Sequence, residues 1–174
     1  TDNGFIEKLE GDYKIYYDSI QHSKKGNLKE SLKRINFLIP KYSNNIFLLE
    51  TKGDILLSYG YDKEAINFYN EVLKKQPDNN YVKYNIFIKL NFKKNNFALN
   101  KKIFSKNLKL INLFPNNQIL ITKFYNLSKK LKYNEWVIFF ETLIFKNKNF
   151  KEKLIKLKKE TKDYNLKKMI NLYT

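Results

Sequence analysis

The fold is decided by residues 46–79, which read IFLLETKGDILLSYGYDKEAINFYNEVLKKQPDN. Apolar residues recur here at helical spacing and predict two helices, over about 47–59 and about 63–75. Gly60 stands where the first helix ends, a place that favours a residue able to adopt a positive φ. Asp62 suits the N-cap of the second helix, because its carboxylate can accept from free backbone N–H groups. This stretch therefore predicts an antiparallel helical hairpin.

Related sequence lies one 34-residue step before this hairpin. In residues 12–45, Gly26 takes the place of Gly60, and Ser19 takes the place of Gly53. One such hairpin cannot bury its own apolar face, so periodic hairpins must stack on one another. We therefore predict an all-α fold, a right-handed α-solenoid of stacked antiparallel hairpins over residues 12–174, preceded by a lead-in over 1–11.

The pattern continues toward the C-terminus with less regularity. The interval from Pro77 to Pro115 spans 38 residues, which predicts a third repeat over 80–117 with a small insertion near 95–100. A fourth repeat is predicted over 118–149, without a glycine at its turn. Residues 150–174 read as two closing helices, about 151–162 and 166–173, which would cover the last apolar face.

Residues 46–79 resemble the tetratricopeptide repeat (TPR) family. The matching residues are Leu49, Gly53, Leu56, Ala65, Tyr69, Val72 and Pro77. Lys52 departs from the family pattern, which usually has leucine there. The resemblance implies that the first helix of each hairpin lines a concave groove. The groove positions that it implies are Tyr13, Tyr16, Phe47, Glu50, Asp54, Tyr81, Tyr84 and Ile88.

A narrower resemblance concerns residues 16–39, which read YYDSIQHSKKGNLKESLKRINFLI, and the lengthened third repeat. This order is similar to the TPR tail of bacterial membrane-associated zinc metallopeptidases of the cell envelope. It implies a location in the bacterial envelope or periplasm, with the cytoplasm as the alternative, and a role in recruiting substrates or partners. Because the chain begins with Thr1, we expect it to be part of a longer or processed protein.

The sequence offers little to catalysis. It contains one histidine and no cysteine, and it lacks the His-Glu-x-x-His helix of those peptidases and the glycine-rich phosphate-binding motifs. Glu50 and Asp54 lie four residues apart on one predicted helix face, where they mimic an acid/base pair. We interpret them instead as a solvated, polar part of the groove. We therefore predict no enzyme, no catalytic residue, no cofactor and no metal site.

The groove residues favour a protein–protein interaction scaffold that binds a peptide or a partner helix. Aromatic side chains can anchor such a ligand through buried apolar area. The same aromatics can instead serve only helix packing, and the sequence leaves both interpretations open. Glu50 and Asp54 would repel a carboxylate, which disfavours the TPR ligands that are held by their C-terminal carboxylate.

The charge of the chain is unevenly distributed. Residues 1–80 carry 12 basic and 12 acidic residues, whereas residues 81–174 carry 22 lysines against 5 acidic residues, a balance of +17. The alternative function is therefore binding of a polyanion such as nucleic acid, or of an anionic membrane. A competing interpretation is the codon bias of an AT-rich genome, since Arg34 is the only arginine. The basic surface is predicted to include Lys93, Lys94, Lys101, Lys102, Lys129 and Lys130.

Overall fold

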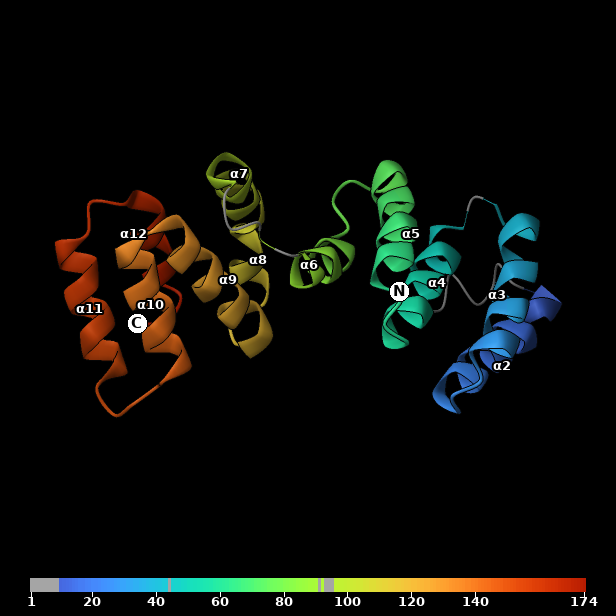
Figure 1. The fold of residues 1–174 in the computed structure, drawn as a ribbon. Helices are drawn as coiled ribbons and strands as arrows, with labels where there is room; N and C mark the ends of the chain where they lie inside the picture. The colour runs from blue at the N-terminus through green and yellow to red at the C-terminus, as the bar shows by residue number, and fades with distance from the viewer. Residues whose placement is uncertain (1–9, 44, 91, 93–95) are drawn as a thin grey trace. The chain divides into compact units, whose positions relative to one another are not determined.

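The computed structural model describes residues 10–43, 45–90, 92 and 96–174, and these residues form helices and turns without any β-strand (Figure 1). The predicted all-α class is confirmed, and the solenoid arrangement stays a prediction. The chain forms two compact units, Thr1–Ile86 (unit 1) and Phe87–Thr174 (unit 2). No helix in the described part has the length and hydropathy of a membrane span.

Unit 1 contains two helical hairpins and the start of a further helix (Figure 1). Its elements are the 3₁₀ turn η1 (Glu10–Asp12), α2 (Tyr13–Lys24), α3 (Leu28–Lys41), α4 (Ile46–Ser58), α5 (Asp62–Lys75) and the first part of α6 (Asn80–Lys89). Helix α2 pairs with α3, α4 pairs with α5, and α3 also packs against α4. The bounds of α3 and α5 differ by 34 residues at both ends, as the sequence period predicts.

The turns within the two hairpins have the same geometry. Gly26 and Gly60 both have a φ of 81°, a value that side chains other than glycine rarely adopt. The next N–H reaches back five residues in each hairpin, from Asn27 to the carbonyl of His22 at 2.8 Å and from Tyr61 to the carbonyl of Leu56 at 3.0 Å. These bonds satisfy carbonyls that a helix end leaves free, and they confirm the role predicted for Gly60.

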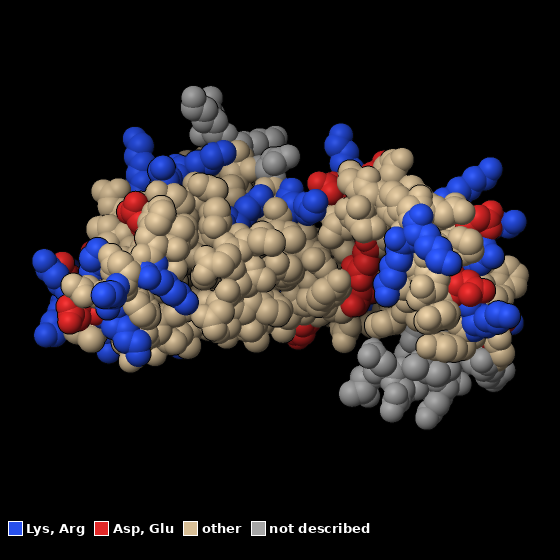
Figure 2. All heavy atoms as spheres, turned by 90° about the horizontal axis from the view of Figure 1, so that it is seen from below, with Lys and Arg blue, Asp and Glu red and all other residues tan. Residues whose placement is uncertain are grey.

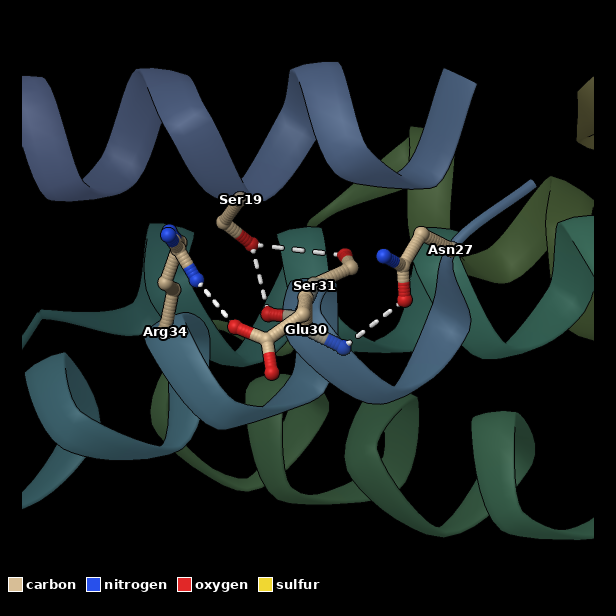
Figure 3. A network of polar contacts seen from close by, with 5 residues as sticks. All are labelled: Ser19, Asn27, Glu30, Ser31 and Arg34. Carbon is tan, nitrogen blue, oxygen red and sulfur yellow. Dashed lines mark hydrogen bonds and ion pairs between the residues drawn. The ribbon is translucent and has the colours of Figure 1, made fainter. Parts of the chain in front are cut away.

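The N-cap prediction for Asp62 is wrong by one residue. Helix α5 begins at Asp62 itself, so the N-cap position belongs to Tyr61, which makes no side-chain capping bond. An acidic residue in the first helical turn still favours the helix, because the N-terminal end of the helix dipole is positive. In the first hairpin the cap is made by Asn27, whose Oδ1 accepts from the backbone N–H of Glu30 at 3.3 Å (Figure 3).

Small residues bring the helices of each hairpin together. A Cβ atom on Gly53 would lie 2.5 Å from Cε1 of Tyr69, so only glycine fits opposite this ring. In the first hairpin, Ser19 is buried at the equivalent position, and Ile35 stands in the place of the tyrosine. Ser19 Oγ donates to the carbonyl oxygen of Ser31 at 2.9 Å across the hairpin (Figure 3). The hairpin with the larger facing residue, Tyr69, therefore has the smaller residue, Gly53, opposite it. The hairpin with the smaller facing residue, Ile35, accommodates Ser19.

The core of unit 1 is mainly aliphatic. One cluster of buried residues joins the two hairpins and contains Ile35, Leu38, Leu48 and Ile55. A second cluster joins α4, α5 and α6 and contains Leu56, Ala65, Tyr69, Val72 and Val82. Helix α6 therefore begins by covering the apolar face of the second hairpin, as a following repeat would.

Unit 2 contains the end of α6 and the remaining helices (Figure 1). These are α7 (Phe97–Asn107), α8 (Lys109–Leu113), α9 (Gln118–Leu131), α10 (Asn134–Ile144), α11 (Phe150–Glu160) and α12 (Tyr164–Ile170). Helix α9 pairs with α10 and also packs against α7, while α11 packs against α10 and α12. Helices α9 and α10 lie within residues 118–149, and α11 and α12 lie within three residues of the bounds expected for the last two helices; their division into a fourth repeat and closing helices stays a prediction.

The third predicted repeat fits the structure least well. The boundary between the units falls inside α6, so a repeat over 80–117 stays a prediction. Helix α7 begins at Phe97, within the stretch 95–100 where the insertion is expected, and residue 95 lies outside the described residues. The second helix of this repeat is also divided, with α7 ending before Leu108 and α8 beginning after it.

The core of unit 2 combines buried aliphatic side chains with a cluster of buried aromatic rings, which the described part of unit 1 lacks. The fully buried ring of Phe124 lies 4.6 Å from that of Phe87, 5.5 Å from that of Phe104 and 5.6 Å from that of Phe140, measured between centroids. The turn after α9 uses Lys132 in the left-handed conformation, with a φ of 57°. This explains why the fourth hairpin forms although its turn contains no glycine.

Candidate binding surface

An aromatic row crosses from the first hairpin of unit 1 to the second. The ring centroids of Tyr13 and Tyr16 on α2 are 6.3 Å apart, and Tyr16 lies 6.1 Å from Phe47 on α4. Tyr13 is 38% exposed, whereas Tyr16 and Phe47 are half-buried against the aliphatic core between the hairpins. The structure therefore brings together three of the predicted groove residues. Tyr13 is the most open of them, and the other two also serve packing.

A pair of carboxylates continues this surface along α4. The hydroxyl of Tyr69 donates to Asp54 Oδ1 at 2.5 Å, and the Asn79 amide donates to Glu50 Oε2 at 2.9 Å. Burial raises the pKa of both carboxyl groups, and these hydrogen bonds oppose that rise. Both side chains are half-buried, so they are less exposed to solvent than the interpretation of a solvated groove expects.

Tyr81 on α6 completes the polar part of the surface. Its hydroxyl interacts with the Asp54 carboxylate, and burial together with that negative charge raises the pKa of Tyr81 to about 12. The phenol therefore stays protonated at neutral pH and can act as a donor. Tyr81 is nevertheless 46% exposed, so its ring is open to a ligand.

Neither carboxylate, Glu50 or Asp54, pairs with a cation in the part of the chain that the structure describes. Lys52, between them in sequence, places its ammonium 4.1 Å from the ring centroid of Phe68, and burial lowers the pKa of this lysine. Half-buried negative charge is thus held by neutral hydrogen-bond donors alone.

We call this region the α2–α4–α6 surface, defined by Tyr13, Tyr16, Phe47, Glu50, Asp54 and Tyr81. The remaining predicted groove residues are Tyr84, which is half-buried on α6 in unit 1, and Ile88, which belongs to unit 2. A groove that includes them stays a prediction. The sequence did not indicate Tyr69 and Asn79 as partners of the carboxylates. They lie 15 and 29 residues from the groups that they hold, so helical periodicity gives no signal for them.

The predicted basic residues are exposed where they are described. Lys93 and Lys94 lie outside the described residues, Lys101 and Lys102 lie on α7, and Lys129 and Lys130 lie on α9. Figure 2 shows Lys and Arg side chains over both units on this face, several of them at the end of unit 2, and a strip of acidic side chains over unit 1.

Part of the basic charge of unit 2 is nevertheless crowded. Burial lowers the pKa of Lys123, and the nearby charges of Lys130 and Lys89 lower it further. Lys130 Nζ donates to the backbone carbonyl of Phe92 at 2.6 Å, and the Lys123 ammonium lies 4.8 Å from the ring centroid of the same residue. Three like charges therefore lie close enough to interact on one side of α9.

Searches with this chain matched no protein-family model, no curated protein and no solved structure. Within the described residues, no three His, Asp or Glu side chains are grouped so that they could hold a metal ion. Fold and site together define an all-helical protein with repeat-like hairpins and an aromatic and acidic surface on one unit.

Proposed function

We propose that this chain is a noncatalytic interaction scaffold whose α2–α4–α6 surface binds a peptide or a helix of a partner protein. The observation that carries the proposal is the pair of half-buried carboxylates, Glu50 and Asp54, which pair with no cation among the described residues and adjoin the exposed ring of Tyr81. Stacked hairpins that expose such a row resemble TPR proteins, and this resemblance gives the proposal its second support.

The surface favours a partner with a basic residue beside an apolar one. Removing a carboxylate from water is unfavourable unless another charge or several donors compensate, and a lysine or arginine of the partner supplies that compensation. The partly exposed ring of Tyr81 offers apolar area next to the charge, and Tyr13 offers a further exposed ring in the aromatic row. A carboxylate in the same place would be repelled.

The wider context is also a proposal. The similarity of residues 16–39 to the tail of envelope metallopeptidases supports a role in recruiting substrates or partners to a larger peptidase or assembly in the bacterial envelope. This part rests on resemblance alone. A full-length gene product without a zinc-binding helix would refute it and leave the surface proposal intact.

The surface proposal is tested with an array of peptides that vary in charge and aromatic content. We expect the full chain to select peptides that carry Lys or Arg beside aliphatic or aromatic residues. The double variant Glu50→Gln and Asp54→Asn should lower the affinity for the selected peptides by about tenfold, because each buried charge–charge contact contributes more to binding than a surface pair. The neutral amides keep acceptor oxygens for Asn79 and Tyr69, so the fold should persist.

Matched variants separate this surface from the rest of unit 1. Tyr13→Ala and Tyr81→Ala should each reduce binding, while Tyr61→Ala, which removes a similarly exposed ring, should not; Glu64→Gln removes an exposed acid of α5 as the charge control. Equal losses in all variants, or selection of acidic peptides by the native chain, would refute the proposed surface.

A second candidate function is binding of nucleic acid or an anionic membrane by unit 2. The interacting charges of Lys89, Lys123 and Lys130 favour it, because an anion between them would relieve their repulsion. Titration of RNA and of anionic vesicles at about 50 mM and about 200 mM salt tests this function, since phosphate contacts weaken steeply with salt. Absence of binding at the lower salt concentration would eliminate it.

A further inference from the structure

A pocket of about 500 Å³ lies within unit 2. Its apolar side contains Phe104 of α7, Tyr133 before α10 and Trp136 of α10. The Phe104 ring meets Tyr133 edge to face at 5.4 Å and Trp136 edge to face at 5.2 Å. The volume is in the range of small-molecule sites, and such a wall suits a flat apolar group.

The acidic groups of this pocket are already occupied by donors. Trp136 Nε1 donates to Asp163 Oδ2 at 2.8 Å, and the other oxygen of Asp163 caps α12 by accepting from the N–H of Leu166 at 3.1 Å. The hydroxyl of Thr161 donates to Glu135 Oε2 at 2.5 Å. These bonds hold α10 against the segment that leads into α12, so the carboxylates have a structural task.

The lysines of the pocket make no structural hydrogen bonds of this kind among the described residues. Lys109 of α8 and Lys168 of α12 both line it, both are exposed, and neither forms an ion pair or hydrogen bond recorded among the described residues. Residues 87–174 as a whole carry 21 lysines against 5 acidic residues, a balance of +16. The two lysines balance the two carboxylates of the lining, Glu135 and Asp163, so the surplus of positive charge in the rest of the unit decides that an anion is favoured over a cation at this place.

We propose that this pocket binds a small aromatic carboxylate. The ring system lies against Phe104, Tyr133 and Trp136, and the carboxylate accepts from the ammonium groups of Lys109 and Lys168. The inference goes beyond the proposed interaction function, because it concerns another unit, another ligand class and the opposite charge.

Trp136 is the only tryptophan of the chain, so its indole N–H gives a single signal in a ¹H–¹⁵N spectrum of the full chain. This signal can be followed while 2-naphthylacetate, neutral 2-naphthylacetamide and cationic 2-naphthylethylamine are titrated in turn. We expect a saturable shift with the acid, an affinity about tenfold lower for the amide, and the weakest binding for the amine.

Variants connect that selectivity to the pocket. Lys109→Gln with Lys168→Gln should reduce the affinity for the acid to that of the amide, whereas Lys151→Gln with Lys159→Gln, two exposed lysines of α11 outside the pocket, should leave it unchanged. Asn112→Phe, at an exposed position of the lining, should fill the pocket and abolish binding of all three compounds.

Three outcomes would overturn the proposal. The first is the absence of a saturable shift with the acid. The second is equal or tighter binding of the amine. The third is unchanged binding of the acid in the double lysine variant or in Asn112→Phe.

Discussion

Units 1 and 2 join their helices by different means. In unit 1 the helices of a hairpin approach through small residues, Gly53 in one hairpin and Ser19 in the other, and aliphatic clusters fill the space between hairpins. In unit 2 large rings fill the same kind of interface around Phe124. The small residues recur at a fixed interval and so produce a detectable period in the sequence. Aromatic rings pack in many geometries, so their contacts require no fixed spacing.

The largest expected effect is the loss of an aromatic ring from unit 2. We expect Phe124→Ala to destabilise this unit by about 3–5 kcal/mol, because the ring is fully buried and contacts three other rings. Hydrogen exchange should show lost protection in α9 and α10, with α2 to α5 retaining theirs. Ile119→Ala, which shortens a side chain that is 62% exposed on the same helix, is the control.

The same experiment can contradict the comparison. If the amides of α2 to α5 lose as much protection as those of α9, the two units unfold together. The difference between them would then concern only packing and not stability.

The next largest effect concerns the close approach in unit 1. Gly53→Ala should cost about 1–3 kcal/mol, because the added Cβ would lie 2.5 Å from the ring of Tyr69. Since the first hairpin accommodates Ser19 opposite Ile35, replacing Tyr69 by Ile should remove most of the added cost of Gly53→Ala. Urea denaturation of the two single variants and the double variant measures this coupling.

The coupling has a definite alternative outcome. If the two free-energy changes simply add, Tyr69 is not what excludes a side chain at Gly53. Gly11→Ala is a suitable control, since a Cβ there would meet nothing within 4 Å.

A smaller effect is expected at the hairpin turns. Lys132 adopts the left-handed conformation that glycine adopts in unit 1, so Lys132→Gly should stabilise the chain by up to about 1 kcal/mol. The entropy that glycine adds to the unfolded chain reduces this gain. Gly60→Ala should destabilise by a similar amount, because it introduces a side chain at a φ of 81°.

If both turns favour glycine at the position with positive φ, the thermal or urea midpoint should rise in Lys132→Gly and fall in Gly60→Ala. Destabilisation by Lys132→Gly would show that the lysine side chain contributes contacts that outweigh its strained backbone. The turns of the two units would then differ in kind.

The parts of the fold that the sequence predicts are those set by local chemistry. Gly60 indicates its turn because few residues tolerate that φ, and the helices of residues 46–79 follow from their apolar spacing. The turn at Lys132 gave no signal, since lysine occupies this conformation only where the surrounding structure enforces it. The boundary between the units within α6 gave none either, because the helical pattern continues across it.

The candidate surface was predicted only in part, for a related reason. The resemblance to the TPR pattern implies that Tyr16 and Phe47 line the same side of neighbouring hairpins, and their rings do lie 6.1 Å apart. The partners of the carboxylates and the pocket beside Trp136 depend on contacts between segments far apart in the chain. Asp163, for example, lies 27 residues from the indole that it binds. Tertiary packing alone brings such groups together.

The smallest expected effect is a pH dependence that distinguishes the two carboxylates of the α2–α4–α6 surface from other acids of unit 1. Burial raises the pKa of Asp54 and Glu50 above the ordinary values of 3.8 and 4.5, so the folded state binds more protons than the unfolded state just above those values. Their contribution to stability therefore falls as pH rises through this window and is constant above it. Asp12 and Glu30 have lowered pKa values, through hydrogen bonds from Lys41 and Arg34 respectively, and contribute in the opposite direction.

The double variant Glu50→Gln and Asp54→Asn removes the first contribution and leaves the second. Urea denaturation from about pH 3.5 to about pH 7 should therefore show the variant gaining stability relative to the native chain as pH rises, until the difference becomes constant. Glu64→Gln, at an exposed position, should give a curve parallel to that of the native chain. A parallel curve for the double variant as well would mean that the two carboxylates are as well solvated as any surface acid. The negative charge proposed to attract a basic partner would then not differ from that of the other acids of unit 1.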